Sequence, residues 1–590
     1  MTGMAGQPTA MHVARIRSGY TDKAGHRREY ESAYLRRTWR DGGTVKHETL
    51  ANLSGLGEQT VALIEAALKG ASLVPAGQAM TITRSLPHGH VAAVHAMAAK
   101  LGLPALLGPA GPQRDLALAL VISRVVAPGS KLSTLAWWSD TTLGADLGVA
   151  QAGDDDVYAA MDWLGARQDA IEAKLARRHL TPEANPGRMA LFDLSSSWLE
   201  GAHCPLAARG YSRDGKKARL QIEYGLLTDP EGRPVAVRVL PGNTGDPAAF
   251  TQIAAVVRDR FKLARMVMVG DRGMITSARI GALRELDEDY GWITALRAPA
   301  IKKLMADDGP LQLSLFDEQD LAEISSPDFP GERLVACRNP FLAAERARKR
   351  EDLLAATERL LRPLIDRVMA GRLRGADAIG VAVGKVIGTH KMAKHLDVAI
   401  TDDSLAVTRR QDSIEAEAAL DGIYVIRTPV PQAELDAAGI VTAYKNLKYV
   451  ERDFRHIKSD DLDLRPVFHR LTRRVKAHVL ICMLAAYLTW HLRRAWAPLT
   501  YTDEEPPQQD NPVAPARRSA AADAKAARKH DQDGRTYHSF RGLLEHLATL
   551  TRNQVRFGGT GTEIPVLAEP TSEQRQAFDL IGAAIPLALT

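Results

Sequence analysis

Two apolar runs in this chain each end on an aspartate, and this pattern restricts the fold more than any other feature. Asp193 follows the run at residues 189–192, and Asp271 follows the run at residues 266–270. A carboxylate at the exit of a buried strand lies at the rim of a sheet, where open α/β folds place their sites. We therefore expect strands at 189–194 and 265–270 that bring both aspartates to one edge of a sheet.

A third acid, Glu451, lies in residues 444–458, which have a helical pattern. At 3.6 residues per turn, the apolar side chains fall on one stripe, formed by Leu447, Val450, Phe454 and Ile457. An adjacent stripe holds Tyr444, Lys448, Glu451, Arg455 and Lys458. Docking of the apolar stripe on the sheet would point Glu451 at the strand ends, with cations around it. A carboxylate among cations stays ionised, as a metal ligand must.

Three carboxylates brought together repel one another unless a divalent cation neutralises them. Hard oxygen ligands select Mg²⁺ or Mn²⁺. Two such ions about 3.5–4 Å apart can bind the attacking and leaving oxygens of a phosphodiester. Asp193, Asp271 and Glu451 are therefore the candidate metal ligands and catalytic residues, and Lys458 and Arg455 are candidate phosphate contacts.

Each of these residues also has an ordinary structural explanation. An aspartate after a strand is often a turn or cap residue, and a glutamate four residues before an arginine is usually a solvated helical pair. Arg272 is open to two interpretations, a phosphate contact or a structural salt bridge. The joint placement of the three acids favours the metal site.

The pattern of elements between residues 186 and 300 is β-β-β-α-β-α-β. The strands are expected at 189–194, 220–227, 234–240, 265–270 and 292–296, and the helices at 246–260 and 277–286. Strands at 12–50 and a helix at 58–68 precede a mostly helical stretch at 88–180. A long interval at 301–420 precedes the next strand at 422–428, and such a length indicates an insertion. Residues 501–535 are polar and predict a flexible linker.

Composition adds weaker limits. The chain of 590 residues carries a net charge of +6, which mildly favours an anionic partner. Its three cysteines are far apart, so neither a zinc ribbon nor a disulfide framework is expected. The first residues lack the apolar core of a signal peptide. The longest apolar stretch, residues 477–490, is too short to span a bilayer and is expected to be a core helix.

The order and motifs resemble the DDE transposases of bacterial insertion sequences, whose catalytic core is ribonuclease H-like. The nearest group has a Tyr-x2-Arg-x3-Glu-x6-Lys signature. Tyr444, Glu451 and Lys458 fit its spacing, and Leu447 occupies the arginine position. Segments 192–198, 242–246, 269–273 and 463–466 also resemble that group. The resemblance covers roughly residues 186–300 and 420–495.

The resemblance implies an α/β fold with a ribonuclease H-like mixed sheet and flanking helices, interrupted by a large insertion, after a mostly helical N-terminal region. The expected parts are a small α+β region at 1–75, a helical DNA-end-binding region at 76–185, the core at 186–300 and 420–500, the insertion at 301–419, a flexible linker at 501–537 and a C-terminal helix and tail at 538–590.

The same resemblance implies a transposase that binds terminal inverted repeats and catalyses DNA strand cleavage and transfer. Asp193, Asp271 and Glu451 would hold two Mg²⁺ ions, with Mn²⁺ as a possible substitute. The residues expected to contact DNA are Tyr444, Lys448, Arg455, Lys458 and Arg272. The partners would be double-stranded transposon ends and target DNA, bound by a homodimer or larger assembly in the bacterial cytoplasm, associated with the nucleoid and without a membrane.

Two other functions are compatible with parts of the pattern. A catalytically silent DNA-binding protein derived from a transposase would need no metal, but all three acids are present. A glycoside hydrolase would use a carboxylate pair, but its groove is usually rich in aromatic residues, which make up only 5% of this chain. It would also leave the cationic stripe beside Glu451 without a role.

Overall fold

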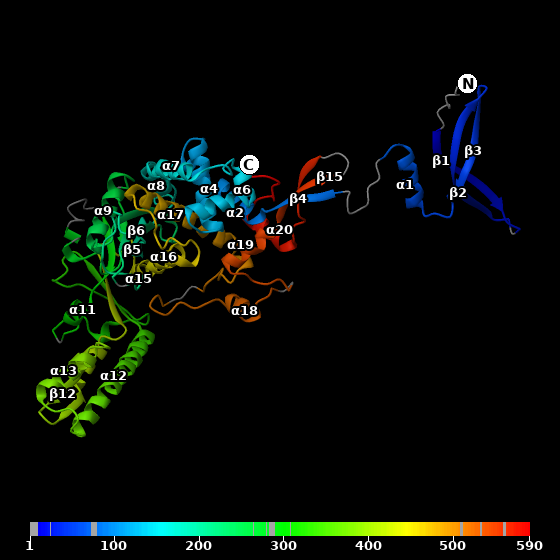
Figure 1. Ribbon diagram of the computed structural model, residues 1–590. Helices are drawn as coiled ribbons and strands as arrows, with labels where there is room; N and C mark the ends of the chain where they lie inside the picture. Colours follow the sequence, from blue (N-terminus) through cyan, green and yellow to red (C-terminus); the bar gives the residue numbers. More distant parts are fainter. Residues whose placement is uncertain are drawn as a thin grey trace. The chain divides into compact units, whose positions relative to one another are not determined.

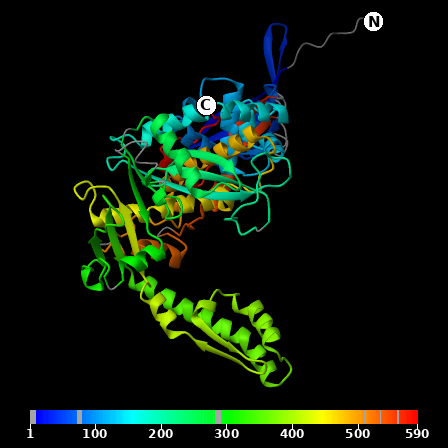
Figure 2. The same cartoon turned by 90° about the vertical axis from the view of Figure 1, so that its left-hand side faces the viewer.

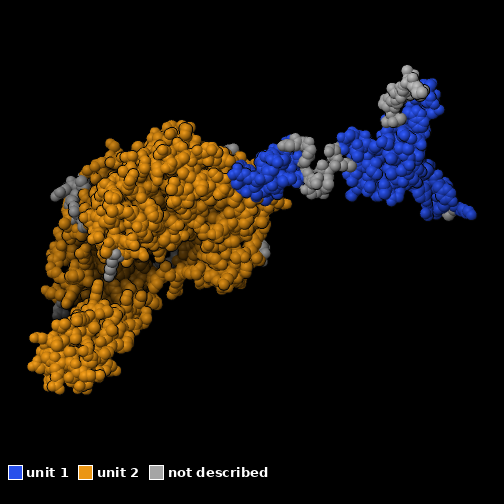
Figure 3. Space-filling view, viewed as in Figure 1, with its two compact units in different colours: residues 1–86, 552–568 blue, residues 87–551, 569–590 orange. Residues whose placement is uncertain are grey.

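The computed structural model describes residues 10–23, 25–71, 80–216, 218–263, 265–278, 280–281, 290–306, 308–507, 511–531, 534–557 and 562–589. The chain forms two compact units (Figure 3). Unit 1 contains residues 1–86 and 552–568, and unit 2 contains residues 87–551 and 569–590.

Unit 1 begins with an antiparallel sheet of three strands, β1 (Ala10–Thr21), β2 (Arg27–Asp41) and β3 (Thr44–Asn52). Helix α1 (Glu58–Leu68) lies on one face of this sheet, at the position predicted for it. Ala33, Leu53 and Val61 form a small core between the sheet and the helix. A second sheet in the order β16-β15-β4 is built from β4 (Met80–Pro87), β15 (Thr551–Phe557) and β16 (Glu563–Leu567).

Unit 2 opens with a helical bundle, as the pattern at 88–180 predicted (Figure 1). Its helices are α2 (Gly89–Lys100), α3 (Leu103–Leu107), α4 (Pro112–Val126), α5 (Lys131–Ser139), α6 (Thr142–Asp146), α7 (Asp154–Gly165) and α8 (Gln168–His179). Helix α17 (Thr472–Ala495) packs against α2, α4 and α7, and α19 (Phe540–Ala548) and α20 (Ser572–Ile581) pack against α2.

The apolar stretch at 477–490 lies inside α17, and this helix is longer than the stretch alone indicated. By length and composition α17 could cross a membrane, but 83% of its apolar window is buried inside the protein. The expectation of a core helix is therefore confirmed.

An eight-stranded mixed sheet forms the centre of unit 2, in the order β10-β11-β14-β9-β8-β5-β6-β7. Its strands are β5 (Met189–Trp198), β6 (Gln221–Thr228), β7 (Pro234–Pro241), β8 (Val267–Val269), β9 (Gly291–Ala295), β10 (Leu321–Ile324), β11 (Arg333–Arg338) and β14 (Ile423–Thr428). Strands β5, β8 and β9 run parallel, and the other pairings are antiparallel. The mixed α/β class predicted from the sequence is confirmed.

Helices cover both faces of the β5–β6 half of this sheet. On one face Phe250 of α9 (Asp246–Asp259) packs against Phe192, with ring centroids 6.2 Å apart. On the other face Phe454 packs edge-on against Tyr224 at 5.6 Å. Because side chains alternate along a strand, Asp193 points away from α9 and toward the face that carries Phe454. The helix predicted at 277–286 lies in part outside the described residues.

The interval predicted as one insertion, residues 301–419, has two structural parts. Helix α11 (Ala298–Leu304), the 3₁₀ turn η2 (Leu313–Leu315), β10 and β11 belong to the sheet and its edge. Residues 340–418 form a lobe with its own apolar core (Figure 2). The lobe contains α12 (Pro340–Met369), α13 (Ala376–Ile387), the 3₁₀ turn η3 (Ala393–His395), a hairpin of β12 (Leu396–Ile400) and β13 (Leu405–Arg409), and α14 (Gln411–Ala418).

After β14 the chain forms α15 (Ala437–Lys445), α16 (Leu447–Arg455) and a π-helical turn, η4 (His456–Asp460). The 3₁₀ turn η5 (Ala497–Leu499) follows α17, and α18 (Ala520–Arg528) lies within the segment predicted as a flexible linker. The described residues of that segment instead pack against the rest of unit 2. Its Val513 is buried and accepts hydrogen bonds from Lys445 and Asn339, and Lys525 is buried as well. Polar composition did not reveal this, because many of the contacts join polar side chains to backbone carbonyls or to one another.

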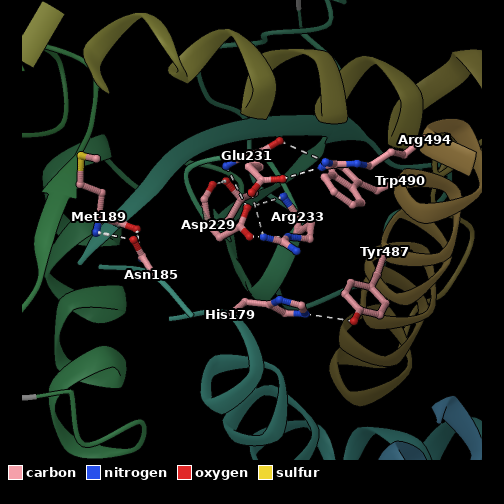
Figure 4. A network of polar contacts seen from close by, with 10 residues as sticks. His179, Asn185, Met189, Asp229, Glu231, Arg233, Tyr487, Trp490 and Arg494 are labelled. Carbon is pink, nitrogen blue, oxygen red and sulfur yellow. Dashed lines mark hydrogen bonds and ion pairs between the residues drawn. The ribbon is translucent and has the colours of Figure 1, made fainter. Parts of the chain in front are cut away.

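The turn between β6 and β7 is fixed by the side chains around it (Figure 4). Asp229 accepts hydrogen bonds from the backbone N–H groups of Glu231 and Arg233, and Gly232 has a φ of +86°. Arg494 of α17 pairs with Glu231 at 2.8 Å. The turn predicted at 229–232 is confirmed, and it ties α17 to the sheet.

Candidate active site

The parallel pairing of β5 and β8 sets Asp193 beside Asp271. Leu191 is in register with Val269. Leu191 and Val269 form the last residue pair between the two strands. Asp193 lies two residues after Leu191 and Asp271 two residues after Val269, so the two aspartates lie side by side just beyond that pair. The chain leaves the sheet at Gly270, where β8 has already ended.

Asp193 itself is not at the end of its strand, contrary to the prediction. Strand β5 continues to Trp198, and Asp193 is paired with Leu226 of β6. Within the apolar run, residues 189–191 pair with β8, and the pairing with β6 begins at Leu191. Beyond Leu191 the strand has lost its parallel neighbour and pairs with β6 alone. Asp193 is therefore held by regular sheet geometry and still borders the opening left by β8.

Glu451 reaches the same place from α16, which packs on β5 and β6. The predicted apolar stripe is buried against the sheet in full: Leu447, Val450, Phe454 and Ile457. The predicted helix at 444–458 is divided, because α15 ends at Lys445 and α16 begins at Leu447, with Asn446 between them. Glu451 is exposed on α16, on the side that faces the strand ends.

The three acids line one cavity of about 680 Å³. Tyr444, Lys448 and Arg272, three of the predicted DNA contacts, line it too. Arg346 of α12 and Tyr424 of β14 also line the cavity. Residues separated by more than 250 positions in the sequence thus share one opening.

The cavity shifts the pKa of Asp193 well above its ordinary value. Burial raises the pKa of Asp193 to about 7, and the charges of Glu451 and Asp271 add to the rise. A hydrogen bond from the backbone N–H of Leu194, 2.7 Å long, and the charge of Arg213 act in the opposite direction. Within the part of the chain that the structure describes, none of the three acids forms a salt bridge.

Tyr444 is tied directly to this cluster. Its hydroxyl donates to Oδ1 of Asp271 at 3.3 Å. Burial raises the pKa of the Tyr444 hydroxyl, and the charges of Asp271 and Glu451 add to that rise. The side chain predicted to contact DNA is thus also a partner of one of the acids.

The donor set fits a divalent cation by its chemistry. Three carboxylates without a cationic partner within 4 Å would be stabilised by a hard ion with oxygen ligands. Among the described residues, however, no three acidic, histidine or cysteine side chains are already close enough to form a finished metal site. Asp193, Asp271 and Glu451 share a cavity, and a bound ion would have to draw their side chains together.

Of the other residues predicted to contact DNA, two line the cavity and two do not. Arg272 and Lys448 are exposed in the cavity, and Lys448 lies 5.0 Å from the ring centroid of Tyr449. Arg455 is exposed on α16 but does not line the cavity. Lys458 is buried, contrary to the expectation that it is free for phosphate.

The π-helical turn explains the position of Lys458. A π turn inserts an additional residue and rotates everything after it relative to an α-helix. Lys458 lies in η4 and donates to Asp214 at 2.8 Å. Arg465 donates to the same oxygen of Asp214 at 2.6 Å. Burial lowers the pKa of Lys458, and the bond to Asp214 opposes that effect.

Asp214 was missed by the sequence analysis. Its side chain is 1% exposed, and it joins the loop after β5 to the segment after α16. In the sequence it lies in an unremarkable turn, Arg213-Asp214-Gly215, more than 240 positions from its partners. No local pattern in the sequence indicated a buried carboxylate at this position.

Comparisons with known proteins agree with the resemblance found in the motifs. Residues 21–75 match the family model "IS1634 family transposase, N-terminal domain", and residues 200–488 match "Transposase DDE domain". The second match includes Asp271 and Glu451 and begins after Asp193.

No curated protein matches the chain. A solved structure described as the piggyBac transposase synaptic complex with hairpin DNA matches 78% of this chain and 76% of that chain, at 10% identity and a TM-score of 0.32. The two family matches show that the chain belongs to the DDE transposases of insertion sequences.

Proposed function

We propose that this chain cleaves and joins DNA at the ends of an insertion sequence, with Asp193, Asp271 and Glu451 as its metal ligands. The observation that carries the proposal is the single cavity that collects these three acids from β5, the end of β8 and α16. The order β7-β6-β5-β8-β9 supports a ribonuclease H-like core, to which β14, β11 and β10 add a further edge.

The residues of the cavity have separate roles in this proposal. Asp193 supplies a ligand from strand β5, Asp271 supplies one from the segment directly after β8, and Glu451 completes the set from a helix docked by its apolar stripe. Two bound Mg²⁺ ions would supply the charge that activates the attacking oxygen and stabilises the leaving one. Tyr444 orients Asp271, and Arg272 and Lys448 hold the phosphates next to the reacting bond.

The protein would act mainly by positioning. Phosphodiester cleavage needs an attacking water or 3′-hydroxyl in line with the leaving oxygen, and no carboxylate has to carry a proton for this. Asp214 would act at a distance from the reaction by holding Lys458 and Arg465 in place. We further propose that the protein works on paired DNA ends as a dimer or larger assembly in the bacterial cytoplasm.

The test is to replace each acid separately, as Asp193→Asn, Asp271→Asn and Glu451→Gln. Each change is expected to reduce Mg²⁺-dependent cleavage of terminal-repeat DNA roughly a hundredfold or more. Binding of the same DNA in a mobility-shift assay should persist. Glu545→Gln, which neutralises an exposed acid on α19, serves as the matched control.

The outcomes separate the candidates. Cleavage that survives one of the three changes removes that residue from the site. A wild-type protein that binds terminal repeats and never cleaves them would favour the catalytically silent alternative. The shared cavity argues against it, since a protein that only binds DNA has no use for three clustered carboxylates.

A further inference from the structure

The three-stranded sheet of unit 1 has one face covered by α1 and one open face. Val13, Ala33 and Leu35 pack toward α1, and Arg15 pairs with Glu58 of that helix at 2.5 Å. Side chains alternate along a strand, so even-numbered positions of β1 and β2 point to the opposite face. We call this opposite face, with the β3 residues in register with it, the open face.

Charge is divided sharply between the two faces. The strands of this sheet contain four acids, Glu29, Glu31, Asp41 and Glu48. All four lie on the α1 side. Three of them are placed there by the strand register, in the pairs Gly19↔Glu29, Arg17↔Glu31 and Arg37↔Glu48. Asp41 lies on the same side because side chains alternate along β2 and its position is odd-numbered.

The open face has no acidic residue in its strands. Its basic and aromatic residues are His12, Tyr20, Arg28, Tyr30, Tyr34, Arg36, Arg40 and His47. The charged groups of the open face, Arg28, Arg36 and Arg40, are therefore all positive, and this face is complementary to an anionic partner.

The groups on the open face are accessible. Tyr20 is 57% exposed and Tyr30 is 52% exposed, so both rings and hydroxyls are accessible to a partner. The Arg28 side chain is 67% exposed, and its nearest acid, Asp22, is 3.7 Å away in the turn after β1. Arg36 is half-buried, with its guanidinium 5.9 Å from the ring centroid of Tyr34.

Duplex DNA fits this surface better than other partners. Outer strands of a three-stranded sheet lie about 10 Å apart, close to the width of the major groove. Strands are an established means of reading DNA grooves. Arginine suits bidentate phosphate and guanine contacts, and tyrosine hydroxyls donate to phosphate.

The helical region predicted to bind DNA ends is less suited to this role. Eleven of the fifteen residues of α4 are buried, and they include Arg124. That helix packs against α17, α7, α2 and α3, so it forms part of the scaffold of unit 2.

We propose that the open face of the unit 1 sheet binds duplex DNA, through Arg28, Arg36 and Arg40 on the phosphates and base edges and the tyrosines beside them. This proposal rests on the proposed function, because the ligand would be the terminal repeat of the insertion sequence. It assigns the recognition of the DNA end to a sheet, not to the helices at 76–185.

The test uses the full chain and two matched double variants of the same sheet. Arg28→Gln/Arg40→Gln removes two charges from the open face. Arg17→Gln/Arg27→Gln removes two charges from the α1 side, where the side chains are 83% and 74% exposed. Affinity for a terminal-repeat duplex is measured by fluorescence anisotropy at several salt concentrations.

The open-face variant should bind roughly tenfold more weakly and should lower the slope of log affinity against log salt by about two. The α1-side variant should change affinity less than about twofold. A third variant, Tyr30→Ser, should also weaken binding with no change in net charge. Unchanged unfolding temperatures exclude loss of folding as the cause.

Two results would overturn the proposal. Equal losses for both double variants would mean that total charge, not this face, governs binding. Unchanged DNA binding together with a lower oligomer mass for the open-face variant would mean that the face meets a second copy of the chain. Failure of the proposed function is distinguished by cleavage: at saturating DNA the open-face variant should still cleave, whereas Asp193→Asn should bind and not cleave.

Discussion

Asp193→Asn should make the metal-free protein more stable while it abolishes cleavage. The carboxyl of Asp193 has a pKa of about 7 against an ordinary value of 3.8, because it is desolvated and lies near Glu451 and Asp271. A pKa raised by about three corresponds to at most about 4 kcal/mol. Since the cavity is open to solvent and screening reduces the penalty, we expect a gain of about 1–2 kcal/mol. The amide keeps the hydrogen bond from Leu194.

The pH dependence has a definite sign. The native state holds a proton on Asp193 that the unfolded chain has lost, so wild-type stability falls as pH rises from about 4 to about 7 and is constant above that. The advantage of Asp193→Asn should therefore be absent near pH 4, grow across this window and be complete above pH 7. Other buried acids titrate in both proteins and cancel in the comparison.

Urea unfolding in EDTA at several pH values measures this advantage, and the same titration in Mg²⁺ provides a second readout. Wild type should gain about 2.7 kcal/mol at a Mg²⁺ concentration one hundred times the dissociation constant. Asp193→Asn should gain much less, and Glu545→Gln should behave as wild type. If Asp193→Asn matches wild type in EDTA at pH 8 and gains equally from Mg²⁺, the three acids do not form a repelling cluster that binds metal.

Three further predictions concern the surroundings of the site. Tyr444→Phe removes the hydroxyl that donates to Asp271 and should lower cleavage several-fold with little change in stability or DNA binding, as a comparison of rates at saturating DNA would show. Asp214→Asn leaves Lys458 and Arg465 without their buried carboxylate and should lower the free energy of unfolding, measured in urea, by about 3 kcal/mol. An unchanged free energy of unfolding would mean that water solvates these three side chains. Phe454→Ala should cost about 3–5 kcal/mol and reduce cleavage by loosening α16, and full activity would show that the stripe does not hold the catalytic glutamate.

Local sequence was sufficient for the parts of the site that depend on near neighbours. The apolar stripe from Leu447 to Ile457 follows from helical periodicity, and all its members are buried. The turn at 229–232 and the helix α1 follow from turn and helix propensities. The choice of Asp193, Asp271 and Glu451 as candidate metal ligands followed from their positions beside these patterns and stays a prediction.

Long-range pairing decided what local patterns could not. No feature of residues 189–194 indicates that β5 extends to Trp198, because that extension depends on β6. The π turn that buries Lys458 is stabilised by Asp214, more than 240 positions away. Residues 501–535 have the polar composition of a linker, but buried residues such as Val513 and Lys525 hold the described part of this segment against the rest of unit 2, and composition does not report such long-range contacts.

The sequence by itself determined which residues are acidic, which stripes are apolar and where helices such as α1 and α9 lie, because these depend on contacts within a few residues. Only the tertiary structure decided the register that sets Asp193 beside Asp271, the cavity that admits Glu451 and the face of the unit 1 sheet that has no acids. Strand pairing joins residues that are far apart in the sequence, and no repeating pattern in the sequence marks which residues pair. The neighbour of a side chain across a sheet is therefore known only once the partner strand and its register are known.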